Sequence, residues 1–242
     1  MSAHLLTVRG VTKTFGALRA LGPVDVDLMP GERLGLIGPN GSGKTTLINC
    51  ITGLFFPEEG TITFNGEDIT RLPAYLRARK GISRTFQIPR PFTGMSVLEN
   101  LLVPLDYLGT RAKKARDRAD EVLIQVGLDA RRDNAVETLS QLELRKLELA
   151  RVLVADPKVL IADEAMAGLS EAEIDDILAL LFKLNEAGVA IIMIEHIMHA
   201  VMRFSQRMIC LETGNMVACG TPKEVAEDPK VQKVYFGEQT HR

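Results

Sequence analysis

Several features are scarce in this sequence, and each scarcity excludes a class of protein. The three cysteines, Cys50, Cys210 and Cys219, are odd in number and lack close paired spacing, so neither a disulfide framework nor a zinc site is expected. The longest strongly apolar run, 189–194, is far shorter than the roughly 20 residues that a membrane helix needs. The net charge of -2 disfavours a surface built mainly to hold nucleic acid.

The N-terminal residues and the charge pattern favour a protein of the cytosol. Residues 1–8 have neither the charged region nor the long apolar core of a signal peptide, and the few cysteines fit a reducing compartment. A basic cluster is interleaved with the acids Asp117, Asp120 and Glu121, which favours a solvated helix face over a nucleic-acid site. The cluster consists of Arg111, Lys113, Lys114, Arg116 and Arg118.

A chain of 242 residues suits one large domain, or one domain that carries an inserted lobe. Short strand-like segments fill the first third, whereas helical periodicity dominates 97–154. The predicted early strands are 5–8, 24–28, 34–37, 61–64 and 81–86. A hairpin is predicted over 208–219, followed by a short helix near 223–227.

Two later apolar runs, 159–162 and 189–194, predict central parallel strands that are covered on both faces. A helix is predicted between them, because Ser170 and Glu173 can form a capping box and Gly188 can close its C-terminus. The three elements predict a right-handed β-α-β crossover.

Residues 38–46, GPNGSGKTT, match the phosphate-binding pattern G-x-x-x-x-G-K-[ST]. They follow an apolar strand and open a helix, so backbone amides and the positive helix end can face phosphate oxygens. Lys44 can contact the β and γ phosphates, and the Thr45 hydroxyl can ligate magnesium. The expected nucleotide-binding residues are Gly38, Pro39, Asn40, Gly41, Ser42, Gly43, Lys44, Thr45 and Thr46.

The segment KVLIADE, 158–164, predicts the hydrolytic half of the same site. Asp163 would stand at the C-terminal edge of the sheet, where it can hold Mg²⁺ through water, and Glu164 can polarise an attacking water. Adjacent Asp and Glu favour hydrolysis over phosphate transfer to a small acceptor. The guanine-reading pattern N-K-x-D of a GTPase is absent from the sequence.

Three further residues are candidates of lower specificity. Gln87 follows the strand 81–86 and could touch the metal and the attacking water. His196, at the end of the strand 189–195, could contact the γ-phosphate. Phe15 could stack on adenine or belong to the core.

In order and spacing these motifs resemble the nucleotide-binding subunit of an ABC transporter along nearly the whole chain. The resemblance identifies Phe15 as the adenine-stacking aromatic, 38–46 as Walker A, Gln87 as the Q-loop, VLIADE as Walker B with catalytic Glu164, 167–170 as the D-loop and His196 as the switch histidine. The segments RTFQIPRPFTGMSVLENLLV, IEHIMHAVM and DPKVQKVYFGE resemble, more narrowly, branched-chain amino acid importers.

The resemblance implies an α/β P-loop NTPase: a RecA-like core with an antiparallel β lobe and a helical lobe inserted at about 88–156, in one domain spanning 1–242. Two such subunits would sandwich two ATP molecules, with Mg²⁺ held by Thr45, Gln87 and Asp163. Two transmembrane permease subunits would dock at the Gln87 segment and helical lobe, an external solute-binding protein would act indirectly, and no nucleic-acid partner is expected. Ile88, Pro89, Pro91 and Phe92 would line the permease contact or pack inside the lobe.

The family signature Leu-Ser-Gly-Gly-Gln reads LSQLE at 139–143. Ser140, which can cap this helix together with Glu143, remains the candidate contact to the partner's nucleotide. Both glycines are missing, Glu143 adds negative charge, and Ser170 replaces the D-loop Asp. These changes suggest that the chain pairs with a different ATPase subunit; alternatively, Ser140 and the helix amides suffice.

The leading interpretation is an ATPase that powers import of a small solute, with branched-chain amino acids inferred from the resemblance. It would act in the cytoplasm, peripheral on the inner face of the cell membrane. A soluble ABC ATPase not tied to transport is an alternative, although such proteins usually carry two cassettes or a long coiled coil. The altered signature also leaves open a regulatory nucleotide-binding subunit of low turnover.

Overall fold

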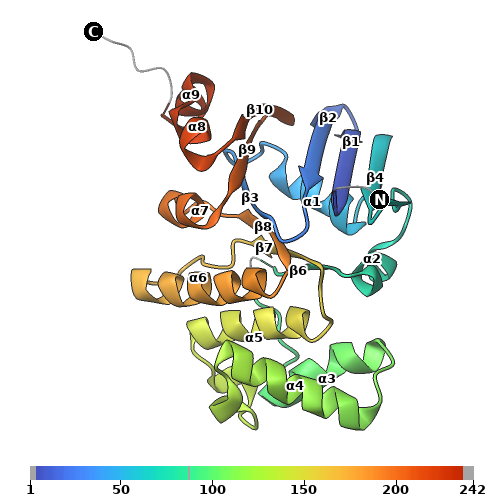
Figure 1. The fold of residues 1–242 in the computed structure, drawn as a ribbon, viewed down its shortest axis with the longest axis vertical. Coiled ribbons are helices and arrows are strands. Elements are labelled where there is room, and N and C mark those ends of the chain that lie inside the picture. Colours follow the sequence, from blue (N-terminus) through green and yellow to red (C-terminus); the bar gives the residue numbers. More distant parts are fainter. Residues whose placement is uncertain (1–3, 87, 237–242) are drawn as a thin grey trace.

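A computed structural model describes residues 4–86 and 88–236. A small antiparallel sheet lies beside α1 at one end, a central sheet runs through the middle, and three helices form the other end (Figure 1). The small sheet has the strand order β2-β1-β4-β5, and the central sheet has the order β10-β9-β3-β8-β7-β6. The predicted α/β architecture with a β lobe and a helical lobe is therefore observed.

The small sheet contains β1 (Leu6–Phe15), β2 (Leu18–Leu28), β4 (Glu59–Phe64) and β5 (Glu67–Asp68). The predicted strands 5–8, 24–28 and 61–64 are confirmed, but β1 and β2 extend to a tight turn between Phe15 and Leu18. Register shifts between Val8 and Thr14 interrupt the pairing of β1 with β2. Because such irregularities break the two-residue alternation, the sequence pattern stops short of the full hairpin.

The central sheet contains β3 (Arg33–Ile37), β6 (Ile82–Arg84), β7 (Val159–Asp163), β8 (Ala190–Ile194), β9 (Arg207–Glu212) and β10 (Asn215–Gly220). Every residue of β7 and β8 is buried, which confirms the two central strands predicted from continuous apolar runs. They pair in parallel, and α6 (Glu171–Glu186) connects them. The predicted C-terminal hairpin is β9 with β10.

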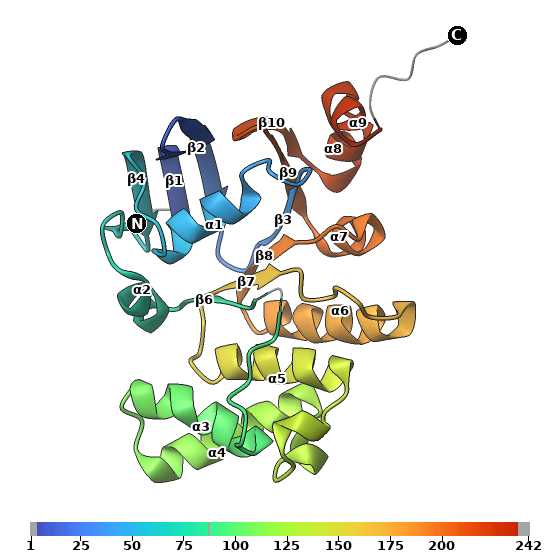
Figure 2. The ribbon, with the colours of Figure 1, turned by 180° about the vertical axis from the view of Figure 1, so that it is seen from behind.

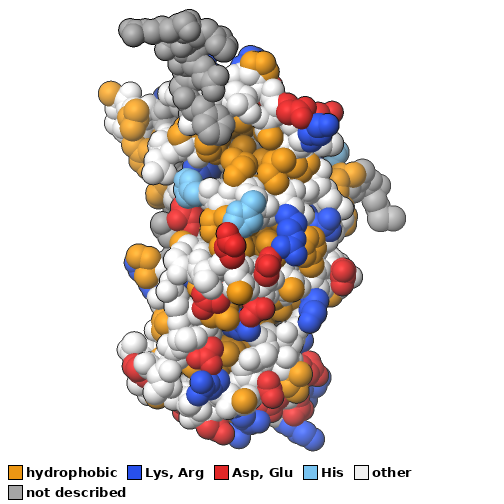
Figure 3. Space-filling view, turned by 90° about the vertical axis from the view of Figure 1, so that its left-hand side faces the viewer, with side chains coloured by type: hydrophobic (Ala, Val, Ile, Leu, Met, Phe, Trp, Pro, Cys, Tyr) orange, Lys and Arg blue, Asp and Glu red, His pale blue; other side chains and the backbone are white. Residues whose placement is uncertain are grey.

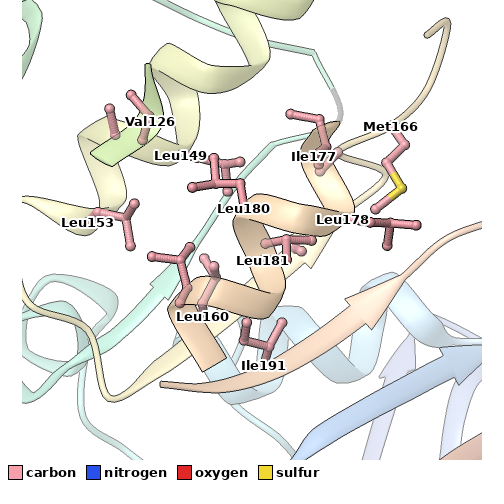
Figure 4. Close-up of a cluster of buried hydrophobic side chains, with 14 of the residues drawn as sticks. Val126, Leu149, Leu153, Leu160, Met166, Ile177, Leu178, Leu180, Leu181 and Ile191 are labelled. Atoms are coloured by element: carbon pink, nitrogen blue, oxygen red, sulfur yellow. The ribbon is translucent and has the colours of Figure 1, made fainter. Parts of the chain in front are cut away.

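Helices α3 (Val97–Tyr107), α4 (Ala112–Val126) and α5 (Gln141–Leu153) gather beyond α6 (Figures 1 and 2). Apolar side chains of α6 pack between α5 and the central sheet (Figure 4). The labelled contacts include Leu149 and Leu153 from α5, Leu180 and Leu181 from α6, and Leu160 and Ile191 from the strands. The same hydrophobic cluster thus joins the helical lobe to the strands that carry the site.

The other helices are short. They are α1 (Lys44–Thr52), α2 (Ala74–Lys80), α7 (Met198–Phe204), α8 (Pro222–Glu227) and α9 (Pro229–Phe236), with 3₁₀ turns at Asp129–Arg131 and Val136–Thr138. The sequence predicted α1 and α8 but not α2 or α7. Neither of the latter has a side-chain cap among the described residues, so the usual start signal is missing.

Surface charges and helix lengths bear on possible partners. On the side drawn in Figure 3, Lys and Arg are interspersed with Asp and Glu over the lower end, where the helical lobe lies. Among residues 4–86 and 88–236, no helix combines the length and the apolar character needed to cross a membrane.

One buried cation holds the P-loop helix to its neighbours. The Arg77 side chain is fully buried and donates to four carbonyls, those of Cys50 (2.7 Å), Ile51 (2.8 Å), Leu72 (2.7 Å) and Thr70 (3.0 Å). Burial lowers the Arg77 pKa to about 10. Two of these carbonyls belong to the last turn of α1, so the guanidinium satisfies orphan acceptors at the negative end of that helix.

We expect Arg77→Met to lower the free energy of unfolding by about 3 to 5 kcal/mol, because it removes the side-chain donor to four carbonyls. Urea denaturation followed by circular dichroism measures this. The exposed Arg71→Met is the matched control and should change stability by no more than about 0.5 kcal/mol. Equal stability of the two variants would contradict the structural role of Arg77.

Candidate functional site

The site begins where β3 ends and α1 starts. Gly43 is the N-cap of α1, and no described side chain caps this helix. Its first backbone bond runs from the Leu47 N–H to the Gly43 carbonyl at 2.9 Å, so the amides that precede Leu47 are left without intrahelical partners. Four successive N–H groups at the positive end of a helix form an anion-binding surface.

Two glycines of this loop are required by its geometry. Gly38 has φ 148°, and a Cβ there would lie 2.3 Å from the Leu211 carbonyl oxygen. Gly43 has φ 102°, and a Cβ there would lie 2.8 Å from the Ala20 carbonyl oxygen. Only glycine combines a left-handed backbone with such close approaches, so the loop needs these positions to be glycine.

Lys44 lies inside the loop. Its Nζ donates to the carbonyls of Gly38 (2.6 Å) and Pro39 (3.0 Å). Burial lowers the Lys44 pKa, while the nearby Glu164 and Asp163 act in the opposite direction. The ammonium thus lies at the pocket and donates to two neutral carbonyls, where an anionic phosphate would be a stronger acceptor.

These residues line a pocket of about 350 Å³. The sequence-predicted residues Phe15, Glu164 and His196 face it together with residues 40–46. Segments far apart in the chain therefore meet here: the end of β1, the P-loop, the end of β7 and the end of β8. Leu18, Arg19, Ala20, Ile194 and Thr213 also line it, and the sequence did not predict them. Leu18, Arg19 and Ala20 belong to the part of β2 that the interrupted alternation concealed.

Phe15 is a surface residue of this pocket rather than a core residue. Its side chain is 43% exposed. It packs edge-on against Phe55 with a centroid distance of 5.2 Å, and Lys13 Nζ lies 5.4 Å from its ring centroid. An aromatic face supported from behind and open at the front suits stacking by a flat, apolar-faced group such as a nucleobase.

Glu164 and His196 meet at the opposite wall. Glu164 has φ 48°, an uncommon conformation for a non-glycine residue, and its N–H donates to the Ile194 carbonyl at 2.8 Å. His196 Nε2 lies 3.2 Å from Glu164 Oε1. Backbone strain of this kind concentrates at functional sites. The pair can orient a water molecule and exchange a proton with it.

Asp163 is held by partners that the sequence did not reveal. Arg84 on β6 contacts Asp163 Oδ2 at 2.5 Å and donates to Asn49 Oδ1 on α1 at 2.6 Å. Both side chains of the ion pair are largely buried. A buried carboxylate needs a charged or polar partner, and Arg84, three residues before Gln87, is the one observed; Gln87 itself lies outside the described residues.

The donor set beside the pocket fits a nucleotide with magnesium. The Ser42 hydroxyl oxygen is buried and has no hydrogen-bond partner among the described residues, so it is an available polar group within the loop. The described residues contain no cluster of three or more His, Cys, Asp or Glu suited to a metal ion. Thr45, which lines the pocket, and Asp163 offer oxygen donors of the kind that Mg²⁺ takes, and this ion completes its shell with water and substrate phosphate.

Ser140 is not among the residues that line this pocket. Its hydroxyl accepts from the Glu143 N–H at 3.2 Å, and the Ser140 N–H donates to Glu143 at 2.8 Å, which confirms the predicted capping box. Arg131 donates to Glu143 at 2.8 Å. The Ser140 N–H and then Arg131 lower the pKa of Glu143, so this helix terminus carries a carboxylate already paired with groups of its own chain.

Glu195 is a buried acid next to His196. It accepts a hydrogen bond from the Met166 N–H at 2.9 Å, and the residue is only 3% exposed. Burial raises its pKa from the usual 4.5 to about 7, against the effect of the Met166 hydrogen bond, while Glu164 raises it further. The folded state therefore retains a proton that the unfolded chain loses as the pH rises above about 4.5.

This pKa predicts that stability declines between about pH 4.5 and pH 7, because the unfolded state releases the proton first. Glu195→Gln keeps an acceptor for Met166 and should raise the free energy of unfolding at pH 8 by about 2 to 3 kcal/mol. Denaturant titrations at pH 5 and pH 8 test this, with the exposed Glu186→Gln as control. An unchanged pH slope in Glu195→Gln would show that Glu195 is ionised in the folded state.

Known proteins resemble this chain in sequence. The sequence profile of the family described as ABC transporter matches residues 21–167, and that of the branched-chain amino acid ATP-binding cassette transporter matches residues 215–241. The chain is 38% identical to the high-affinity branched-chain amino acid transport ATP-binding protein BraF of Pseudomonas aeruginosa, over 98% of this chain and 100% of that protein. It is 39% identical to LivG of Escherichia coli, which bears the same description, with the same coverage.

A solved structure gives the same result for the fold. The ADP conformation of MJ1267, an ATP-binding cassette of an ABC transporter, superposes with a TM-score of 0.89 at 31% identity, over 98% of this chain and 100% of that one. The predicted P-loop NTPase fold is thereby confirmed.

Proposed function

Because the chain belongs to the ABC transporter family and is an ATPase of that family, we propose that its own pocket binds ATP and that hydrolysis there powers import of branched-chain amino acids. The observation that supports this most is the meeting of Phe15, the P-loop, Glu164 and His196 around one pocket. The substrate is inferred from the descriptions of BraF and LivG and from the profile match at 215–241.

In this proposal the adenine stacks on Phe15 and the phosphates lie along residues 38–46. The amides at the start of α1 bind phosphate oxygens, and Lys44 exchanges its two carbonyl acceptors for the β and γ phosphates. Thr45, Asp163 and Gln87 would hold Mg²⁺, which when bound neutralises charge on the phosphates.

Hydrolysis then depends on the opposite wall of the pocket. Glu164 accepts the proton of the attacking water, which places it as the general base. His196, 3.2 Å from Glu164, orients that carboxylate and contacts the γ-phosphate. Arg84 contacts both Asp163 and Asn49 of α1. It therefore keeps the Asp163 carboxylate in a fixed position relative to the P-loop helix.

We propose that permease subunits dock in a hollow beside the segment that follows β6. A cavity of about 420 Å³ there is lined by Phe86, Phe92, Pro104, Tyr107 and neighbouring residues. Phe92 is 38% exposed, and Arg151 lies 4.5 Å from its ring centroid. Ile88 is 68% exposed, which favours its predicted role at a contact over packing inside the lobe.

Docking can be tested by co-purification with the permease subunits of the same importer. We expect Phe92→Glu to abolish capture of the chain by a tagged permease, because the substitution removes an aromatic contact surface and puts a charge beside Phe86 and Tyr107. Phe56→Glu is the matched control, since Phe56 is 41% exposed and does not line that hollow. Equal capture of both variants would contradict docking at this surface.

We further propose that the chain forms one ATPase domain over 1–242, with a helical lobe at about 88–156, and works in the cytoplasm on the inner face of the membrane. Its LSQLE segment suggests a different ATPase subunit as partner.

Light scattering of the Glu164→Gln variant with ATP and Mg²⁺ tests this pairing, because it measures the mass of the chain in solution. A monomer is expected, and a tight ATP-dependent homodimer would contradict obligate pairing with another chain.

A further inference from the structure

The altered signature residues make contacts within their own chain. Gln141 and Arg145 lie four residues apart, on the same face of α5. Gln141 Nε2 donates to the Ala167 carbonyl at 3.2 Å, and Arg145 Nη2 donates to the same carbonyl at 3.1 Å. Gly168 lies so close that a Cβ there would be 2.4 Å from Gln141 Nε2. Gln141, which stands where the family has glycine, therefore fills space against the D-loop.

The next turn of α5 reaches a second functional segment. Glu148 accepts from the Phe86 N–H in a short hydrogen bond, and Arg145 Nη1 lies 3.4 Å from the Phe86 carbonyl oxygen. Arg145 and Glu148 are 3.8 Å apart, with side chains only 5% and 6% exposed. The peptide groups of Phe86, immediately before Gln87, are thus held on both sides by one buried ion pair.

The residue immediately before the D-loop is held by a different segment of the chain. The Met166 N–H donates to Glu195 at 2.9 Å, one residue before His196. Ala167, the next residue, offers its carbonyl to α5. Adjacent residues are therefore fixed by the strand that carries the switch histidine and by the signature helix, which leaves this short segment little freedom to move by itself.

We propose that Gln141, Arg145 and Glu148 form a clamp, here named the α5 clamp, that fixes Phe86 and Ala167 relative to one another and so sets the position of the D-loop for hydrolysis. The three are positioning residues, since none of them lines the nucleotide pocket. The Gln141 side chain, which a glycine at this position would lack, thereby ties α5 to Ala167. The effect on turnover rests on the proposed ATP hydrolysis, whereas the tether itself does not.

Two measurements test the clamp: hydrogen exchange on the full-length chain, and ATPase kinetics on that chain assembled with its partner ATPase subunit and the permease subunits. Arg145→Met removes one donor to each of the Phe86 and Ala167 carbonyls and leaves Gln141 as the remaining side-chain donor to Ala167, so the amides of 166–170 should exchange at least tenfold faster. The kcat for ATP with Mg²⁺ should fall at least tenfold, while KM changes less than twofold because the pocket is intact. Lys146→Met, on the same helix and outside these contacts, is the matched control and should change neither quantity.

Gln141→Ala keeps the test decisive if Arg145→Met does not fold, because it removes one exposed donor and leaves the buried ion pair. It should raise exchange in 166–170 two- to threefold. Exchange equal to that of Lys146→Met in every folded clamp variant would overturn the tether. Faster exchange with unchanged kcat would overturn its role in positioning. A wild-type chain without ATP turnover in the assembled transporter would contradict the proposed function but leave the exchange measurement valid.

Discussion

Glu164→Gln is expected to lower the rate of ATP hydrolysis at least 100-fold and to change ATP affinity less than twofold. The substitution keeps the size of the side chain and its place 3.2 Å from His196 Nε2, but an amide cannot accept the proton of the attacking water. General base catalysis contributes about 10² to 10⁴ in rate. Phosphate release measured alongside equilibrium binding of ATP separates the two effects.

The matched control for this experiment is Glu186→Gln, at the exposed C-terminal end of α6. It makes the same chemical change far from the pocket and should leave hydrolysis unaltered. Hydrolysis by Glu164→Gln at more than a tenth of the wild-type rate would show that another group accepts the proton.

Lys44→Ala is expected to weaken ATP binding at least 100-fold. The ammonium is the only basic group of the P-loop segment 38–46, and burial among carbonyls keeps it in position for an anion. Removing it loses charge-assisted hydrogen bonds to two phosphates, each worth about 1.5 to 3 kcal/mol. Isothermal calorimetry with ATP and Mg²⁺ measures the loss.

Two controls separate binding from folding in that experiment. Lys183→Ala changes an exposed lysine on α6 and should bind ATP as the wild type does. Thermal unfolding of Lys44→Ala without nucleotide reports any effect of freeing the Gly38 and Pro39 carbonyls. A folded Lys44→Ala protein with unchanged ATP affinity would contradict the assignment of the phosphate site.

The parts of the fold that the sequence predicted are those with short-range signals. Strands β7 and β8 appear as continuous apolar runs, and the P-loop has fixed spacing between a strand and a helix. The capping box at Ser140 joins residues three apart and was predicted for the same reason.

The missed parts depend on contacts between distant residues. Arg84 meets Asp163 across 79 positions of the chain, and Glu148 meets Phe86 across 62. A sequence pattern reports charge and period but not which buried charges pair, so neither contact could be predicted. Phe15 shows the same limit. Its neighbours in the sequence do not decide between a core position and a ligand contact, and the structure decides it because Phe15 is 43% exposed and lines the pocket.

The structure explains why the LSQLE segment lacks the family's glycines. Its pattern predicted a good capped helix and a poor phosphate binder. The structure confirms the capped helix and shows that Gln141 bonds to Ala167 while Glu143 is paired with Arg131. We infer that the LSQLE segment serves contacts within its own chain. This agrees with the proposed pairing, in which a different subunit supplies the signature for the ATP bound by this chain.

The central claim is that ATP hydrolysis at Glu164 drives solute import. The most direct test is uptake of labelled leucine into vesicles with enclosed ATP and Mg²⁺ and with the solute-binding protein outside. The vesicles carry the permease subunits, the partner ATPase subunit, and either wild type or Glu164→Gln. The account predicts uptake with wild type and less than a tenth of it with Glu164→Gln, at equal ATP binding. Equal uptake with both would contradict it and indicate a regulatory nucleotide-binding subunit.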